Sequence, residues 1–310
     1  MTSSAMQEIG VDFHSGSQKL AGTLAMPQSG SKLPVVLLLP GSGQTDRNNN
    51  AKQLKINFFP PLVSALADRG IASFRYDKRG VGASGGDFWS CGFHDLLADA
   101  KEAVSFLATR SEIDPERIFV LGHSEGAIIA LNLAASDSGV SGAVLLAGSA
   151  KTGQETIVWQ TQKIASSLTG LNKLILRLFR IDVVKGVRKN LARIQSAPGD
   201  SARIQGRKVN AKWMREFLKH DPKLDLKRLR LPTLALTGSS DVQVDPEDIA
   251  LMAELAAGAL EGEVLNELSH LFRQDKDSVG LKSYRKQAKQ PVDPQAVQTV
   301  VEWLSSRAGN

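Results

Sequence analysis

One serine of this chain lies in a sequence setting that would make its hydroxyl reactive. Residues 122–126 read Gly-His-Ser-Glu-Gly, which fits the pattern Gly-x-Ser-x-Gly. The apolar run over 117–121 predicts a buried strand, and the Ala-, Ile- and Leu-rich segment from Glu125 predicts a helix. A sharp turn between them would hold Ser124 in a strained conformation, and the flanking glycines remove Cβ atoms that would collide across it. The pattern therefore predicts a nucleophile rather than an ordinary glycine-rich turn that happens to contain a serine.

A nucleophilic serine needs a base, and the base needs an acid that orients it. In an open parallel sheet, side chains that follow the strands meet beyond the C-terminal ends of those strands. Asp241 follows a predicted strand over 233–237, and His270 follows a predicted strand over 263–268. We therefore predict a catalytic triad of Ser124, Asp241 and His270.

Other candidates for the base and the acid fit less well. His14 lies in an N-terminal hairpin, His94 opens a predicted helix, and His220 stands beside Asp-Pro in the sequence. The turn at the serine should point His123 away from the reaction. Asp245 precedes a proline and a helix, so an N-cap is its more natural role.

Acyl transfer also needs donors for the oxyanion of the tetrahedral intermediate. The backbone N–H of Glu125, the residue after the serine, is one predicted donor. The second should come from the loop after the predicted strand over 35–39, where residues 40–43 read Pro-Gly-Ser-Gly. We predict the Ser42 N–H, with Gly43 and Gln44 as alternatives.

The elements that would position these groups alternate between strands and helices, which predicts a mostly parallel sheet covered on both faces, an α/β fold. Predicted strands form a hairpin over 9–26 and then cover 35–39, 71–76, 117–121, 142–147, 233–237 and 263–268. Predicted helices cover 62–69, 96–107, 125–135, 247–257 and 296–304. Between about 150 and 230 no strand-like run is found, and helices are predicted over 159–168, 171–194 and 209–219.

Five motifs of the chain resemble those of α/β-hydrolase-fold serine hydrolases of the bacterial esterase type, a group similar to dienelactone-hydrolase-like and serine-aminopeptidase-like proteins. They are Pro-Gly-Ser-Gly at 40–43 with Asp-Arg at 46–47, Tyr-Asp-Lys-Arg-Gly-Val-Gly-Ala-Ser at 76–84, Gly-His-Ser-Glu-Gly at 122–126, Gly-Ser-Ser-Asp at 238–241 and Ser-His at 269–270. The resemblance implies an α/β-hydrolase core from 1–149 and 231–310. It also implies that the insertion at 150–230 is a helical cap over the serine.

The chain departs from the resemblance in two places. Residues 40–41 are Pro-Gly where many relatives have His-Gly, which bears on the second oxyanion donor. A serine at 124 disfavours the chemistry of similar dehalogenases and epoxide hydrolases, which carry aspartate there, and of dienelactone hydrolases proper, which carry cysteine. Charged residues in the loops near the serine are interpreted as ion pairs that brace the loops rather than as substrate ligands; they are Asp46, Arg47, Asp77 and Arg79.

Composition bounds the setting of the protein. The chain has 310 residues, and its longest apolar runs, 35–39 among them, have five residues, far fewer than the roughly 20 residues of a membrane span. Residues 1–10 lack the pattern of a signal peptide, so we expect none. Cys91 is the only cysteine, which excludes an intrachain disulfide and favours a cytoplasmic protein.

The basic charge of the chain is concentrated in the predicted cap. Residues 151–230 hold 19 Lys and Arg against 6 Asp and Glu, a net charge of +13, whereas the rest of the chain has a net charge of −7. Three interpretations stay open: a cap that buries an apolar stripe with solvated charges, attraction of anionic substrates such as acyl-CoA thioesters, or adsorption to an anionic membrane. Nucleic acid is disfavoured as a partner because no binding motif is present.

Together these features predict hydrolysis of small-molecule carboxylic esters through an acyl-enzyme, without a metal or an organic cofactor. The same triad would serve an acyl thioesterase or a small-peptide or amide hydrolase. The alternative from another class is a catalytically silent α/β-hydrolase that acts as an interaction protein. Acyl chain length, leaving group and oligomeric state stay open at this level.

Overall fold

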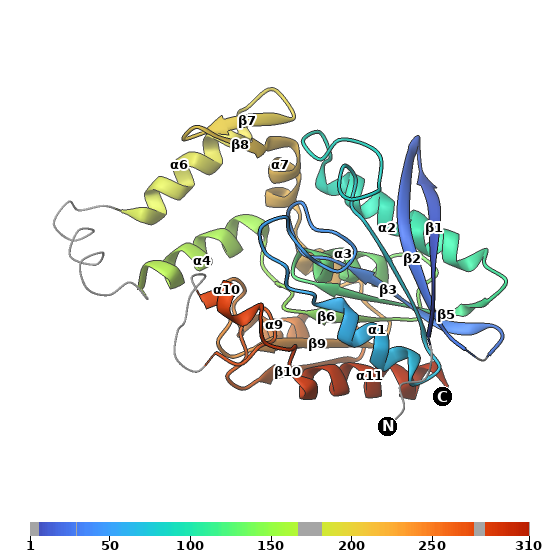
Figure 1. The fold of residues 1–310 in the computed structure, drawn as a ribbon. Helices are drawn as coiled ribbons and strands as arrows, with labels where there is room; N and C mark the ends of the chain where they lie inside the picture. Colours follow the sequence, from blue (N-terminus) through green and yellow to red (C-terminus); the bar gives the residue numbers. More distant parts are fainter. Residues whose placement is uncertain (1–5, 29, 167–181, 276–282, 310) are drawn as a thin grey trace.

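The structure is a computed structural model that describes residues 6–28, 30–166, 182–275 and 283–309 (Figure 1). Its centre is an eight-stranded sheet with the strand order β1-β2-β4-β3-β5-β6-β9-β10. The strands are β1 (Met6–Ser15), β2 (Gln18–Pro27), β3 (Leu33–Leu39), β4 (Ala72–Tyr76), β5 (Ile113–His123), β6 (Gly142–Leu146), β9 (Thr233–Gly238) and β10 (Leu260–Leu265). β2 pairs antiparallel with β1 and β4, and the other neighbours are parallel. The predicted α/β fold is confirmed.

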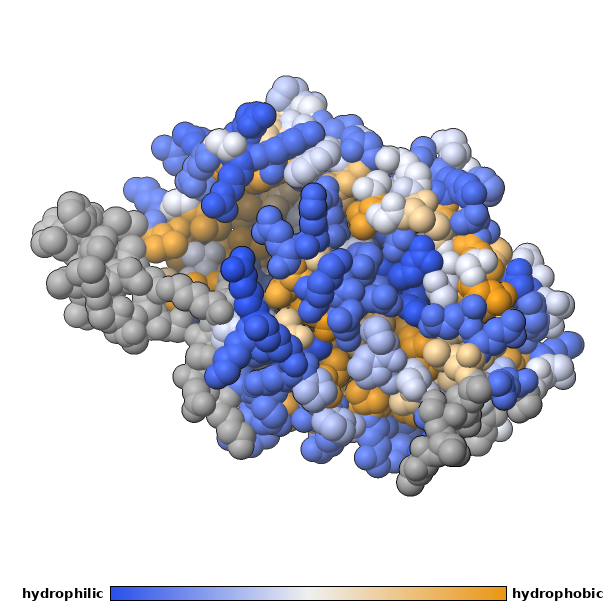
Figure 2. All heavy atoms as spheres, in the orientation of Figure 1, coloured by the Kyte–Doolittle hydropathy of each residue, from blue (hydrophilic) through white to orange (hydrophobic). Residues whose placement is uncertain are grey.

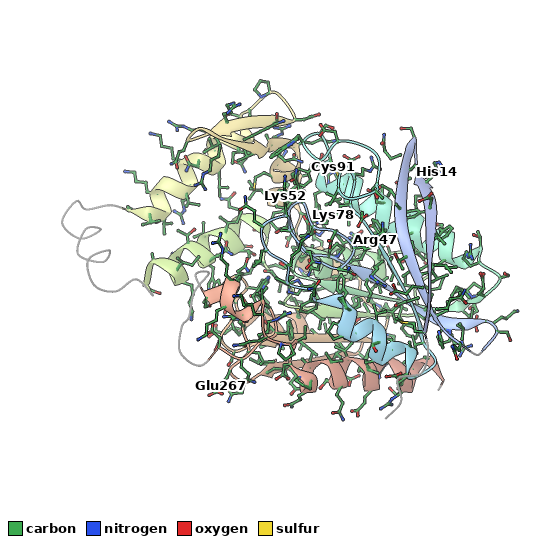
Figure 3. The ribbon with its side chains drawn as sticks, in the orientation of Figure 1. His14, Arg47, Lys52, Lys78, Cys91 and Glu267 are labelled. Atoms are coloured by element: carbon green, nitrogen blue, oxygen red, sulfur yellow. The ribbon has the colours of Figure 1, made fainter. Side chains whose placement is uncertain are left out.

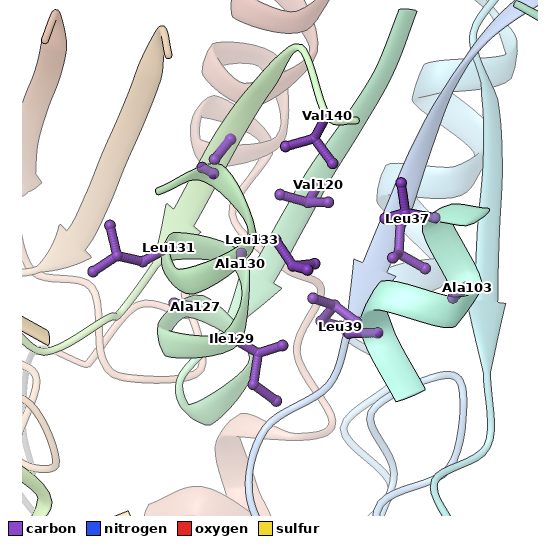
Figure 4. Close-up of a cluster of buried hydrophobic side chains, with 14 of the residues drawn as sticks. Leu37, Leu39, Ala103, Val120, Ala127, Ile129, Ala130, Leu131, Leu133 and Val140 are labelled. Atoms are coloured by element: carbon purple, nitrogen blue, oxygen red, sulfur yellow. The ribbon is translucent and has the colours of Figure 1, made fainter. Parts of the chain in front are cut away.

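Helices cover both faces of the sheet and bury a core on each side. They are α1 (Phe59–Ala67), α2 (Phe93–Ala108), α3 (Glu125–Ala134), α9 (Asp248–Leu255), α10 (Tyr284–Gln287) and α11 (Pro294–Ala308). On β3, Leu37 and Leu39 enter the cluster with α2 and α3 (Figure 4), whereas Val36 and Leu38 enter the cluster with α1 and α11. This burial on both faces explains why β3 is apolar at every position.

The chain between β6 and β9 forms elements that lie mostly at one side of the sheet (Figure 1), except for α8, which packs against α3 and α9. It contains α4 (Gly153–Ser166), α6 (Val183–Gln195), β7 (Ser201–Ile204), β8 (Arg207–Asn210), α7 (Ala211–Lys219) and α8 (Pro222–Leu226). Most of the expected helices are present, although residues 167–181 of those predictions lie outside the described part of the chain.

The expectation that this segment is free of strands is wrong. β7 and β8 pair antiparallel, and the two residues between them, Gln205 and Gly206, have φ values of +50° and +78°. Two consecutive positive φ values are typical of the tight turn that matches the twist of a β-hairpin. Each strand has only four residues, which is too short for an alternating pattern to be recognised in the sequence.

Within the described ranges, no helix combines the length and the apolar composition that a membrane span requires. β10 also differs from its prediction, since it covers 260–265 rather than 263–268. Leu265 and Leu268 are both buried, but Leu268 already belongs to the loop that leads to His270. The apolar signal therefore extends past the end of the strand.

Candidate active site

Ser124 occupies a strained turn between β5 and α3. Its φ of +57° and ψ of −117° lie in a region that few residues other than glycine adopt, and its N–H donates to the Leu146 carbonyl at 2.8 Å. A Cβ at Gly122 would lie 1.9 Å from the Gly126 carbonyl oxygen, and a Cβ at Gly126 would lie 2.1 Å from the Leu39 carbonyl oxygen. Both glycines are therefore required for the turn that presents the serine.

Asp241 and His270 follow β9 and β10 and form a buried pair. Asp241 Oδ2 lies 2.7 Å from His270 Nδ1, and Asp241 Oδ1 accepts the N–H groups of Gln243 at 2.7 Å and Val244 at 3.0 Å. Because a carboxylate only accepts hydrogen bonds, this contact places a proton on Nδ1 and leaves Nε2 as an acceptor. The pair therefore has the arrangement that a general base requires.

Two of the three predicted triad residues line one cavity, and the third, Asp241, is hydrogen-bonded to one of them. Ser124 and His270 both line it, together with Ser42, Gln243 and Tyr284; we call it the His270-side cavity. A second cavity, the Ser124-side cavity, shares Ser42, Ser124 and Gln243 with the first. Its other lining residues come from the core and the insertion; they are Glu125, Ile128, Ala147, Ser149, Thr156, Ile157, Gln160, Trp213, Phe217 and Val244. Figure 2 shows hydrophobic side chains at the bottom of a recess beside the hydrophilic surface of the insertion.

His123 does not turn away from the site but lies buried under it. Its Nδ1 lies 2.9 Å from Asn49 Nδ2, and its Nε2 lies 2.9 Å from the backbone oxygen of His270. Burial, together with the nearby His270, lowers the pKa of His123 to about 3, so its ring is neutral. With Asn49 donating to Nδ1, the proton is on Nε2 and is donated to the His270 carbonyl. His123 thus holds the loop that carries His270 in place.

The loop after β3 is anchored through the backbone of Gly41. The Gly41 N–H donates to Asn49 Oδ1 at 2.9 Å, and the Gly41 carbonyl accepts from Lys78 Nζ at 2.6 Å and Thr45 Oγ1 at 2.9 Å. In a trans peptide the carbonyl and the following N–H point in opposite directions. The Ser42 N–H is therefore directed away from Lys78 and Thr45.

The predicted oxyanion donors lie beside the serine. A Cβ at Gly41 would lie 3.5 Å from Ser124 Cβ, so the loop lies against Ser124. Ser42 and Glu125 line the Ser124-side cavity with Ser124. Among the described residues, neither the Ser42 N–H nor the Glu125 N–H has a protein acceptor. Both groups are thus available to a ligand.

A buried ion pair beside these donors was not predicted. Lys78 Nζ lies 2.5 Å from Glu125 Oε2, and the indole Nε1 of Trp213 on α7 donates to Glu125 Oε1 at 2.5 Å. Lys78 and Glu125 are both buried. Opposite charges in the two motifs at 76–84 and 122–126 were a signal for the ion pair, but nothing in the sequence pointed to Trp213.

Charged side chains of the loops brace one another, as predicted. Arg47 Nη2 lies 2.7 Å from Asp77 Oδ2, and Arg79 Nη2 lies 2.6 Å from Asp99 Oδ1. Burial favours a higher pKa for Asp77, but hydrogen bonds from Arg47 and Ala83 hold that pKa below its ordinary value. These residues therefore stabilise loop conformation, and Figure 3 labels Arg47 among them.

None of the other candidate residues lines the cavities around Ser124 and Ser42. His14 is exposed on β1 (Figure 3), His94 lies 3.6 Å from Glu216, and His220 lies 3.1 Å from Asp225. Asp245 pairs with Lys151 at 2.6 Å and accepts the N–H of Glu247 at the start of α9. In the described part of the chain, no three His, Cys, Asp or Glu side chains gather as they would around a metal ion.

Solved structures share this fold at low sequence identity. Est1E from Butyrivibrio proteoclasticus, solved with ferulic acid, has a TM-score of 0.61 at 16% identity, over 96% of this chain and 96% of that one. DcsB, solved with a substrate analogue, has a TM-score of 0.65 at 17% identity, over 99% of this chain and 100% of that one.

Sequence comparison finds relatives and a family. Esterase EstD of Thermotoga maritima is 26% identical over 287 residues, which cover 92% of this chain and 65% of EstD. The uncharacterized protein Rv2307c of Mycobacterium tuberculosis is 32% identical over 130 residues, which cover 42% of this chain and 41% of that relative. The chain thus spans less than two thirds of the length of EstD. Residues 54–277 match the family described as serine aminopeptidase, S33, and the chain therefore belongs to this family of α/β-hydrolases.

Proposed function

We propose that the protein is a serine hydrolase that cleaves carboxylic esters through an acyl-enzyme. The observation that carries this proposal is the His270 ring, which is bonded to Asp241 at Nδ1 and borders the same cavity as Ser124. The match to EstD, an esterase, over 92% of this chain supports the same activity.

In the proposed reaction, Ser124 Oγ attacks the ester carbonyl carbon while His270 Nε2 takes the hydroxyl proton. The N–H groups of Ser42 and Glu125 stabilise the oxyanion, and Asp241 stabilises the imidazolium. The intermediate collapses, the C–O bond to the alcohol breaks, and Nε2 returns its proton to the departing oxygen. In the second half of the reaction, His270 Nε2 takes a proton from water while the water oxygen attacks the acyl carbon. The bond from that carbon to Ser124 Oγ then breaks, Nε2 returns the proton to Oγ, and the carboxylic acid leaves.

The charges around Ser124 favour an uncharged ester over a peptide with a free amino terminus. Recognition of an α-ammonium group requires an unpaired carboxylate. Among the described residues of the cavities around Ser42, Glu125 is the one acidic lining residue, and Lys78 already neutralises it. Recognition of an anionic substrate would rest on the basic outer surface of the insertion instead.

We also propose that residues 150–230 act as a cap over the site, in an enzyme of the cytoplasm that acts on small-molecule esters. The Trp213–Glu125 hydrogen bond supports the cap, because it joins α7 to the first residue of α3. The single cysteine of the chain supports the proposed cytoplasmic location.

A fluorophosphonate probe tests the proposed function. We expect it to label the wild type and not Ser124→Ala. Absence of labelling in the wild type would instead support a catalytically silent interaction protein. Hydrolysis of p-nitrophenyl butyrate, butyryl-CoA and alanine p-nitroanilide should then rank the ester first. A higher kcat/KM for the thioester would assign a thioesterase activity instead, and a higher kcat/KM for the anilide would assign an amide hydrolase.

A further inference from the structure

A third cavity adjoins the site on the side of the oxyanion donors. It has a volume of about 270 Å³ and shares Ser42, Glu125 and Trp213 with the Ser124-side cavity. Its apolar lining side chains come from the loop and helix after β4 and from the insertion; they are Phe88, Cys91, Leu96, Val209 and Met214. We call this cavity the apolar chamber. Figure 3 labels two of its lining residues, Lys78 and Cys91.

The side-chain amide of Asn210, which borders the apolar chamber, is already satisfied by protein partners. Asn210 Nδ2 donates to the carbonyls of Phe88 at 2.6 Å and Cys91 at 2.7 Å. Asn210 Oδ1 accepts the backbone N–H of Trp213 at 2.9 Å. Asn210 therefore offers no free donor to a ligand. Burial raises the pKa of Cys91 to about 12, which keeps its thiol neutral.

The charged side chains at its border are paired in the same way. Lys78 is bound to Glu125 at 2.5 Å, and Arg79 is bound to Asp99 at 2.6 Å. Apart from the Ser42 hydroxyl, a ligand group in the chamber consequently meets hydrocarbon, a neutral thiol, a satisfied amide and neutralised ion pairs. Such surroundings bind uncharged apolar groups and reject charged ones, because a buried charge without a partner is costly.

The chemistry of the triad decides which part of an ester can reach this chamber. His270 must return its proton to the departing alcohol oxygen, so the alcohol must lie on the side of the histidine. His270 lines the cavity that contains Thr45, Leu54 and Tyr284, and it does not line the apolar chamber. The acyl group is then left with the two cavities that His270 does not line. From the Ser124-side cavity a long chain can pass Ser42 and Trp213, which line both cavities, into the apolar chamber.

We propose that the apolar chamber binds the acyl chain, and that the substrates are esters of carboxylic acids whose uncharged apolar chain is long enough to reach past Ser42 and Trp213 into it. This proposal rests on the proposed esterase function. Each methylene group that enters the chamber should raise kcat/KM roughly threefold to fourfold, since it leaves water for an apolar cavity. Lengthening the alcohol part of the ester should change kcat/KM much less.

The test compares p-nitrophenyl octanoate with p-nitrophenyl acetate in variants that change the volume of the chamber. Val209→Trp should lower the octanoate-to-acetate ratio of kcat/KM at least about tenfold, because the indole occupies the space of the chain. Met214→Ala should raise the corresponding ratio for decanoate. Val187→Trp is the matched control, since Val187 is a partly exposed residue of α6 that lines none of the three cavities; its ratio should equal that of the wild type.

Three outcomes would overturn the proposal. In the first, Val209→Trp lowers both rates equally in a folded protein. In the second, Val209→Trp changes the preference between ethyl acetate and octyl acetate, which would assign the chamber to the alcohol. In the third, Ile157→Trp in the Ser124-side cavity lowers the octanoate-to-acetate ratio while Val209→Trp does not. Failure of the proposed function itself would look different, because the wild type would hydrolyse none of these esters.

Discussion

Lys78 and Glu125 form a buried ion pair that connects both proposed oxyanion donors. Lys78 Nζ lies 2.5 Å from Glu125 Oε2 and 2.6 Å from the Gly41 carbonyl oxygen. One ammonium group thus fixes the peptide that carries the Ser42 N–H and the side chain of the residue that carries the other N–H. Trp213 holds the second oxygen of Glu125 from α7. The geometry of the donors therefore depends on charges that do not touch the substrate.

Loss of Lys78 should impair catalysis more than binding. In Lys78→Met, kcat for p-nitrophenyl butyrate should fall about 10- to 100-fold with little change in KM, because misplaced donors weaken stabilisation of the transition state. Rates must be normalised to active sites titrated with a fluorophosphonate. Lys101→Met on the exposed side of α2 is the matched control and should keep the wild-type kcat. An unchanged kcat per titrated site in Lys78→Met would show that the ion pair only stabilises the fold.

The free energy of unfolding should depend on whether the buried charges of Lys78 and Glu125 are paired. Lys78→Met leaves the Glu125 carboxylate unpaired and should lower the free energy of unfolding by about 3 kcal/mol, measured by urea denaturation. Adding Glu125→Gln removes that charge, so the double variant should regain part of the loss while kcat stays low. If the double variant has a lower free energy of unfolding than Lys78→Met alone, this account of the pair is contradicted.

The acid of the triad can be identified by substitution of two aspartates. Asp241→Asn should lower kcat about 10³- to 10⁴-fold, because an amide at this position no longer fixes the histidine tautomer or stabilises its charged form. Asp245→Asn, whose carboxylate contacts Lys151 rather than the histidine, should lower kcat no more than a few-fold. The reverse order of the two effects would assign the acid role to Asp245.

The neutral His123 predicts how stability depends on pH. Its pKa is lowered from 6.5 to about 3 in the folded protein, so the unfolded chain binds a proton first as the pH falls. Stability should therefore decrease from about pH 6.5 downward, and this single group should account for about 2 kcal/mol between pH 7 and pH 5. In His123→Gln the difference in unfolding free energy between these two pH values should be smaller by that amount. An equal difference in both proteins would show that His123 is not the group responsible.

The turn at the nucleophile should tolerate no side chain at Gly122. A Cβ there would lie 1.9 Å from the Gly126 carbonyl oxygen, so Gly122→Ala must displace the backbone that presents Ser124. We expect loss of fluorophosphonate labelling and a lower melting temperature. Gly186→Ala on α6 is the matched control, since a Cβ there meets nothing within 4 Å; it should be neutral or stabilising by up to about 1 kcal/mol. Normal labelling of Gly122→Ala would refute the strained geometry.

The fold could be predicted because it depends on patterns of residues that are close in the sequence. β3 is apolar at every position because both of its faces are buried, and the glycines at 122 and 126 are fixed by contacts across one turn. The strand–loop order also brought Asp241 and His270 to one edge of the sheet.

The contacts that stabilise the site could not be predicted in the same way. Asn49 reaches His123 across 74 positions, and Trp213 reaches Glu125 across 88. Such contacts depend on loop conformations and on how the insertion packs, and neither leaves a periodic signal. The prediction that His123 points away failed for this reason, since its partners come from two distant loops.

Intact-protein mass spectrometry during turnover tests the central claim most directly. With p-nitrophenyl butyrate in excess, the wild type should gain the mass of one butyryl group, and peptide mapping should find that group on Ser124. Ser124→Ala should show neither the added mass nor hydrolysis above the uncatalysed rate. Turnover of the ester by the wild type with the acyl group on another residue, or turnover that persists in Ser124→Ala, would contradict the account.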